Sequence, residues 1–120
     1  MIEELILKKR TGDILPRKRG KGSKAEARVS KLYRKAGYKV RRNLRSRAGE
    51  IDILAKRGNE RLLVEVKSGR QTITSTDVLK VVRKARYHKA KPVIRKSGLA
   101  TLTSSAREVA KKYNVRIKNY

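Results

Sequence analysis

The sequence predicts an α/β domain in which helices flank a central mixed β-sheet, with the element order αβββαβαβ. Residues 49–55 and 62–67 are two apolar segments on either side of Gly58-Asn59, a dipeptide suited to the positive φ angles of a tight hairpin turn. Two other segments, 24–36 and 75–89, carry apolar residues at helical spacing. A chain of 120 residues is long enough for one domain with a modest core.

The N-terminal part, residues 1–23, is predicted to lie outside the main domain, which would span residues 24–120. Residues 1–7 are apolar and fit a strand or a helix. Pro16 to Lys24 read Pro-Arg-Lys-Arg-Gly-Lys-Gly-Ser-Lys, a run of glycines and cations that cannot bury itself. We therefore expect a basic arm before the first helix of the domain.

The first half of the domain is predicted to contain a helix, a strand and the hairpin. The helix runs from about residue 24 to 36 and ends at Gly37. A strand over 38–42 and a loop over 43–48 precede the hairpin. The face of the helix expected to turn inward carries Ala25, Val29, Leu32, Tyr33 and Ala36.

The second half is predicted to alternate helices and strands. A helix starts at Ser75 or Thr76 and runs to about residue 89, followed by a strand over 92–95, a helix over 103–113 and a strand over 115–117. Residues of the first of these helices expected to face inward are Val78, Leu79, Val82 and Ala85, and the cations expected on its outer face are Lys80, Arg83, Lys84 and Arg86.

The hairpin register brings charged residues together on otherwise apolar strands. With Gly58-Asn59 in the turn, Leu54 faces Leu63 and Asp52 faces Glu65. Lys67 lies two residues beyond Glu65 and emerges on the same face. Two neighbouring carboxylates repel each other, and a bound divalent cation is the usual compensation.

The charge of the chain indicates its partner. Thirty-five Lys and Arg against ten Asp and Glu give a formal charge of +25, which destabilises a compact state unless a polyanion such as nucleic acid binds. The absence of cysteine excludes disulfides, zinc–thiolate sites and thiol nucleophiles, and the single histidine, His88, excludes a His-rich metal site. The chain lacks an apolar run of transmembrane length, so we expect a soluble cytoplasmic protein without membrane contact.

At these residues the chain resembles a known superfamily. Asp52, a spacer and Glu65-Val66-Lys67, preceded by a helix that carries Glu26, are similar to the motif of the PD-(D/E)XK, or restriction endonuclease-like, nucleases. Within that superfamily the chain looks most like archaeal Holliday-junction resolvases, and also like Mrr-type endonucleases and small proteins with a Gly-Glu-Ile-Asp motif. The resemblance covers about residues 21–120.

The resemblance implies a metal-dependent DNA endonuclease with a restriction endonuclease-like fold. Its catalytic residues would be Glu26, Asp52, Glu65 and Lys67. Asp52, Glu65 and the backbone carbonyl of Val66 would hold Mg²⁺, for which Mn²⁺ would substitute, and Glu26 would reach the ion through water. Lys67 would orient or deprotonate the attacking water, or hold the scissile phosphate.

Each candidate residue also has a structural interpretation. Asp52 and Glu65 could be a charged pair on a solvated sheet face. Glu26 follows Ser23 at the spacing of a capping box and could serve as a helix cap as well as in catalysis. Glu50, opposite Lys67 in the inferred register, could pair with that lysine or act as a further metal ligand.

The expected DNA contacts come from the basic arm and from the strand and loop that lead into Asp52. They are Arg17, Lys18, Arg19, Lys21, Lys24, Arg42, Arg45, Arg47 and Ser68. The sequence thus predicts a junction resolvase that acts as a homodimer on branched DNA. The alternatives are an Mrr-like or repair endonuclease on duplex or branched DNA, and a catalytically silent DNA-binding protein.

Overall fold

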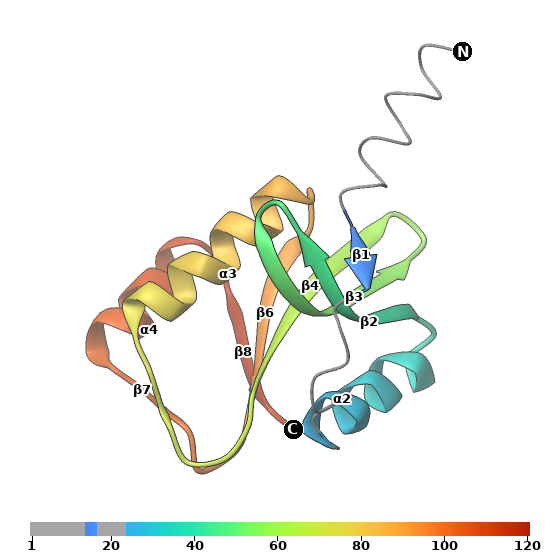
Figure 1. Cartoon of the computed structure of the whole chain (residues 1–120). Helices are drawn as coiled ribbons and strands as arrows, with labels where there is room; N and C mark the ends of the chain where they lie inside the picture. The colour runs from blue at the N-terminus through green and yellow to red at the C-terminus, as the bar shows by residue number, and fades with distance from the viewer. Residues whose placement is uncertain (1–13, 17–23) are drawn as a thin grey trace.

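The computed structural model describes residues 14–16 and 24–120, and in this part of the chain a six-stranded mixed sheet is flanked by helices (Figure 1). The strand order is β1-β2-β3-β4-β6-β8; neighbours from β1 to β4 are antiparallel, and β4, β6 and β8 are parallel. The strands of this sheet are β1 (Leu15–Pro16), β2 (Lys39–Ser46), β3 (Gly49–Arg57), β4 (Glu60–Lys67), β6 (Lys91–Lys96) and β8 (Arg116–Asn119).

The helices cover both faces of the sheet. Helix α2 (Lys24–Lys35) lies on one side, and α3 (Ser75–Tyr87) and α4 (Ser104–Lys112) lie on the other (Figure 1). A small parallel pair, β5 (Thr72–Ile73) with β7 (Thr101–Leu102), joins the segments that lead into α3 and α4. The predicted order αβββαβαβ and the predicted fold class are confirmed, with three short strands, β1, β5 and β7, added.

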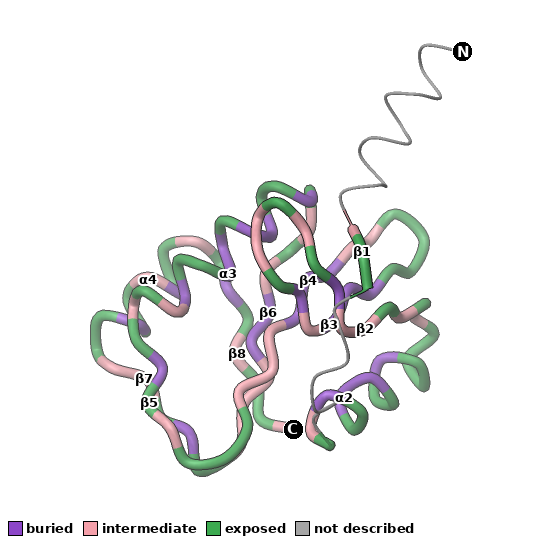
Figure 2. Tube along the Cα trace, viewed as in Figure 1, coloured by how far each residue is buried: buried purple, intermediate pink, exposed green. Residues whose placement is uncertain are grey.

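Two hydrophobic cores form because side chains alternate across the strands. On the α2 side, Val29 and Tyr33 pack with Ile53, Val64 and other residues of the sheet. On the other side, α3 and α4 pack on a cluster that includes Leu54, Leu63 and Ile94. Because both faces are covered, the central strands are buried over consecutive residues, Ile53 to Ala55 in β3 and Leu62 to Val64 in β4, and Figure 2 shows these strands purple in the middle of the sheet.

The central hairpin follows the predicted register. Leu54 pairs with Leu63 and Arg57 with Glu60, and Gly58 in the turn has a φ of 59°. Strand β2 runs on to Ser46, where the sequence predicted a loop from residue 43. The prediction was wrong because β2 pairs with β3 as far as Ser46–Gly49, so cross-strand hydrogen bonding outweighs the polar composition.

A bend in β2 and β3 lies next to the predicted site. Leu44 pairs with Ile51 and Arg42 with Ile53, so Asn43 is opposite Asp52. Asn43 has a φ of 53°, and Ile51 belongs to the α3–α4 core whereas Ile53 belongs to the α2 core. The two strands therefore change faces together at the Asn43–Asp52 position.

The predicted inward faces of α2 and α3 are confirmed in part, since Val29, Tyr33, Val78, Val82 and Ala85 are buried. Leu32 and Leu79, expected inside, are 42% and 39% exposed, whereas Ser30 and Val81 are fully buried. The inward residues of α2 recur at i, i+3, i+4 and i+7, but two of them, Glu26 and Ser30, are polar. Ranking positions by apolarity alone consequently missed these two polar members of the α2 stripe.

Candidate active site

Strand pairing brings Asp52 and Glu65 together at the point where β3 leaves β4. The β3–β4 ladder ends at Ile53–Val64, and the next pair in the same register is Asp52 and Glu65. The Asp52 Oδ2 atom accepts a hydrogen bond of 2.9 Å from the backbone N–H of Val66. The Asp52 carboxylate thereby satisfies a β4 donor beyond the end of the ladder.

The two carboxyl groups interact strongly. The side chain of Glu65 is 14% exposed. Burial, together with the hydrogen bond and the negative charge of Asp52, raises the pKa of Glu65 to about 7, although the nearby Lys84 ammonium opposes the rise. The Glu65 carboxyl consequently resists ionisation beside the charged Asp52 carboxylate. A cation bound between the two groups would lower the free-energy cost of ionising Glu65.

The donor set fits a magnesium ion. Within residues 14–16 and 24–120, no group of three or more His, Cys, Asp or Glu side chains is arranged to hold a metal. Mg²⁺ prefers oxygen ligands, keeps several of its waters and is usually held by one or two carboxylates plus phosphate oxygens of the substrate. Asp52 and Glu65 supply two carboxylates, so the remaining ligands would be backbone oxygen, water and phosphate.

Lys84 is a residue of this site that the sequence placed elsewhere. Its predicted position on the outer, solvated face of α3 is wrong, because Lys84 is buried and 8% exposed. Its Nζ atom donates to Glu65 Oε2 at 3.0 Å and to the carbonyl oxygen of Glu50 at 2.7 Å. The observed inward stripe of α3 includes Val81, and Lys84 lies three residues beyond it at the edge facing the carboxylates.

Lys67 ends β4 and lies close to the first turn of α3. Burial alone would raise the pKa of Asp77, but hydrogen bonds from Thr74 and the charges of Lys67 and Lys80 lower it. Asp77 also completes a capping box with Thr74 at the start of α3. The Lys67 ammonium is therefore in electrostatic range of this helix terminus, on the α3 side of the sheet.

Glu26 is buried in the first turn of α2, on the same inward face as Val29 and Ser30. Helix α2 covers the face of the sheet opposite to α3, and among the described residues Glu26 does not form a metal-holding group with Asp52 and Glu65. The capping box needs Ser23, which lies outside the described residues, and the water-mediated metal contact remains a prediction.

Glu50 does not follow the predicted pairing. Its cross-strand partner is Arg45 in β2, because the β3–β4 ladder stops before Glu50 could pair with Lys67. Its side chain is exposed, and its carbonyl oxygen holds Lys84.

Five of the residues predicted to contact DNA lie in the described part of the chain. Arg42 lies half-buried in β2 opposite Ile53, and its Nε atom has no hydrogen-bond partner among the described residues. Lys24, Arg45, Arg47 and Ser68 are exposed. Arg17, Lys18, Arg19 and Lys21 lie outside the described residues, so the predicted arm and the boundary between residues 23 and 24 stay predictions.

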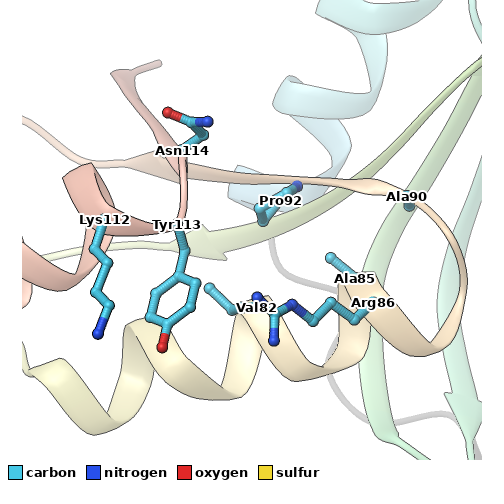
Figure 3. Close-up of a pocket in the computed structure, with 8 residues that line it drawn as sticks. All are labelled: Val82, Ala85, Arg86, Ala90, Pro92, Lys112, Tyr113 and Asn114. Carbon is cyan, nitrogen blue, oxygen red and sulfur yellow. The ribbon is translucent and has the colours of Figure 1, made fainter.

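The cavity between α3 and α4 has a different character. It measures about 250 Å³, and Figure 3 shows Tyr113, Arg86 and Lys112 gathered at its rim. The guanidinium of Arg86 lies 5.1 Å from the Tyr113 ring centre. None of the described residues that line this cavity carries a carboxylate, so they do not supply the oxygen ligands that metal-dependent hydrolysis needs.

The fold and the paired carboxylates define a class, the restriction endonuclease-like proteins. Residues 18–119 match the family described as restriction endonuclease (Mrr_cat). The match spans most of the chain, and the chain belongs to this family.

The chain also belongs to the UPF0102 family. It is 37% identical over 76 residues to the UPF0102 protein WS0451 of Wolinella succinogenes, covering 58% of this chain and 70% of the relative. It is 40% identical over 70 residues to the UPF0102 protein SPO0400 of Ruegeria pomeroyi, covering 58% of this chain and 57% of the relative. It is 48% identical over 50 residues to the UPF0102 protein of Kosmotoga olearia, covering 41% of this chain and 44% of the relative.

The chain thus spans about half the length of the last two relatives. All three relatives are bacterial and lend no support to the archaeal character that the sequence resemblance suggested.

A solved structure shares the fold. The crystal structure of a protein of unknown function, AF1548, superimposes with a TM-score of 0.61 at 15% sequence identity, covering 78% of this chain and 55% of that chain. At this identity the likeness concerns the fold alone.

Proposed function

We propose that this chain is a Mg²⁺-dependent DNA endonuclease that hydrolyses phosphodiester bonds at the Asp52–Glu65 pair. The observation that carries the proposal is the convergence of these two carboxylates, with a hydrogen bond from the Val66 N–H to Asp52, inside a restriction endonuclease domain that spans residues 18–119. Paired carboxylates at the ends of adjacent strands supply the hard oxygen ligands that this chemistry requires.

Each residue of the site would have its own role in metal binding or in the hydrolysis. Asp52, Glu65 and the carbonyl oxygen of Val66 would hold Mg²⁺ or Mn²⁺, and Glu26 would contact it through water. The bound ion would polarise the phosphate and lower the pKa of a water molecule. Lys67 would orient that water, take its proton or hold the scissile phosphate.

DNA is the proposed substrate because of charge. The formal charge of +25 favours phosphate-backbone contacts, which position a protein without reading sequence. Arg42, Arg45 and Arg47 lie on β2 and the turn that follows it, next to the strand that carries Asp52. In the described part of the chain, no helix is long and apolar enough to cross a membrane.

Among DNA structures we propose a four-way junction, resolved by a homodimer. A junction needs two nicks on strands of like polarity, and the described domain carries one Asp52–Glu65 pair. A symmetric dimer would place two such sites on either side of a two-fold axis. Val109, Tyr113 and β8 are the proposed contact surface. Cleavage of ordinary duplex is the second candidate, which the match to the Mrr restriction endonuclease family favours.

The test is cleavage of a labelled four-way junction and of a linear duplex of the same sequence, with and without Mg²⁺. Asp52→Asn and Glu65→Gln should each lower cleavage at least about a hundredfold while DNA affinity stays within severalfold, because affinity resides in Lys and Arg. Symmetric paired nicks on the junction support a resolvase, and equal cutting of both substrates supports the duplex endonuclease. DNA binding without any cleavage would leave a silent binding protein.

A further inference from the structure

The geometry points to Lys84 as the built-in counter-ion of the candidate metal site. We infer that its ammonium holds Glu65 when no divalent cation is bound, and that a divalent cation must displace it from Glu65 in order to bind. This inference rests on the proposed function and adds to it a competition between a side chain of the protein and its metal.

The contacts of Lys84 are those of a fixed ion pair. Its Nζ atom lies 3.0 Å from Glu65 Oε2, and the two side chains are 10% and 14% exposed. Burying an ammonium costs several kcal/mol unless acceptors replace its water. Glu65 and the carbonyl oxygen of Glu50, at 2.7 Å, are those acceptors.

The backbone is shaped to admit this lysine. The Cδ atom of Lys84 lies 3.4 Å from the position that a Cβ atom would occupy on Gly49, and Gly49 has a φ of 123°. The missing side chain at residue 49 thus leaves room for the Lys84 stem beside β3. This close approach gives a physical reason for glycine directly before Glu50.

The second acceptor makes exchange feasible. If the ammonium leaves Glu65, it retains its hydrogen bond to the Glu50 carbonyl and is not stranded in the protein interior. Asp52 and Glu65 then face the incoming cation with both charges available. Ammonium and cation would both be drawn to Oε2 of Glu65, and their like charges repel at short range.

The charge balance of the site predicts how substrate would help. Above pH 7, where Glu65 is ionised, two carboxylates and one ammonium leave a net charge of about −1, which attracts a divalent cation weakly. A phosphate of bound DNA adds negative charge on the metal side, and would tip the exchange toward the cation. Metal and DNA should therefore bind with positive coupling.

The experiment measures Mn²⁺ binding to the full chain without DNA, from the loss of the free-ion electron paramagnetic resonance signal. Lys84→Met should tighten Mn²⁺ binding at least about fivefold, because a cation within a few ångströms of the site is removed. Lys80→Met is the matched control. Lys80 is exposed and lies one helical turn before Lys84 on α3, so removing its ammonium should change Mn²⁺ affinity less than twofold. Lys84→Gln repeats the test should the methionine variant fold poorly.

A second arm needs no metal. The unfolding free energies of Lys84→Met, Glu65→Gln and the double variant form a cycle, and a fixed ion pair predicts that the effects are clearly non-additive. Additive effects, or Mn²⁺ affinity that is unchanged or weaker in Lys84→Met, would overturn the inference. If the wild-type protein still binds Mn²⁺ and cleaves DNA in that case, the proposed function stands. If wild type neither binds Mn²⁺ nor cleaves DNA, the proposed function fails and the exchange fails with it.

Discussion

At the scale of single residues, the Asp52–Glu65 pair combines the chemistry of the candidate site with a cost to the fold. Asp52 has a structural partner in the Val66 N–H, whereas Glu65 is held by Lys84 and is crowded by the Asp52 charge. A site that repels its own charges is less stable before its ligand binds, and functional sites commonly carry such a cost.

The pH dependence of stability should report this cost. The pKa of Glu65 rises from 4.5 to about 7 in the fold, so between these values the folded protein keeps a proton that the unfolded chain has released. The free energy of unfolding should therefore fall as pH rises through this window, by an amount of the order of 3 kcal/mol.

Glu65→Gln cannot titrate at residue 65 and should lose this part of the pH profile. Urea denaturation of both proteins at pH 5 and pH 8 without divalent cations should show the variant gaining stability relative to wild type at the higher pH. Glu108→Gln, at an exposed position of α4, is the control and should follow the wild-type profile. A parallel shift of the Glu65→Gln curve at both pH values would contradict the pKa assignment.

Some residues of the site could be predicted from sequence and others could not. Asp52 and Glu65 meet because a two-residue turn at Gly58-Asn59 fixes the hairpin register, and register is a local property of the sequence. Lys84 could not be found in this way. Its burial depends on the exact rotation of α3 and on the room beside Gly49, which are tertiary properties. The signal available in the sequence was the predicted pair of neighbouring carboxylates, which requires a compensating cation close by.

At the scale of elements, α3 matters most for the site, because it carries Lys84 and starts near Lys67. Its first turn is fixed by a capping box in which the Thr74 side chain accepts from the Asp77 N–H and the Asp77 carboxylate accepts from the Thr74 N–H. The predicted start at Ser75 or Thr76 agrees with the observed helix, since residue 74 supplies the cap.

Removing this cap should weaken the whole domain. Thr74→Ala should lower the free energy of unfolding by about 1 kcal/mol, because it removes the side-chain acceptor from the helix N-terminus. Thr76→Ala, at an exposed position two residues along, should change stability much less. Chemical denaturation of both variants measures the difference; equal losses would show that the capping box contributes nothing specific.

At the scale of the whole molecule, the dominant property is the excess of positive charge. Thirty-five cations face ten anions, so even if every anion took part in an ion pair, as Glu60 and Glu65 do, most of the cations would stay uncompensated. The unbound protein therefore repels itself, and a polyanion should both bind and stabilise it.

The predicted basic arm can be tested through the salt dependence of DNA binding. Replacing Arg17, Lys18, Arg19 and Lys21 together by glutamine leaves the β1 residues in place. It should weaken binding and flatten the plot of log affinity against log salt, by roughly one unit for each DNA phosphate that the arm no longer neutralises. Cleavage at saturating protein should persist. An unchanged slope would mean that these cations do not touch DNA.

The bend at Asp52 has a consequence for how this molecule tolerates mutation. Asp52 separates Ile51, which packs in the α3–α4 core, from Ile53, which packs in the α2 core. An insertion or deletion here would turn the residues on one side of the change to the wrong face of the sheet, and would uncover apolar surface in a core. In a mutational scan, folding should therefore survive many replacements of the carboxylate at position 52 but not the loss of the position itself, which separates the role of the side chain from the role of the spacing.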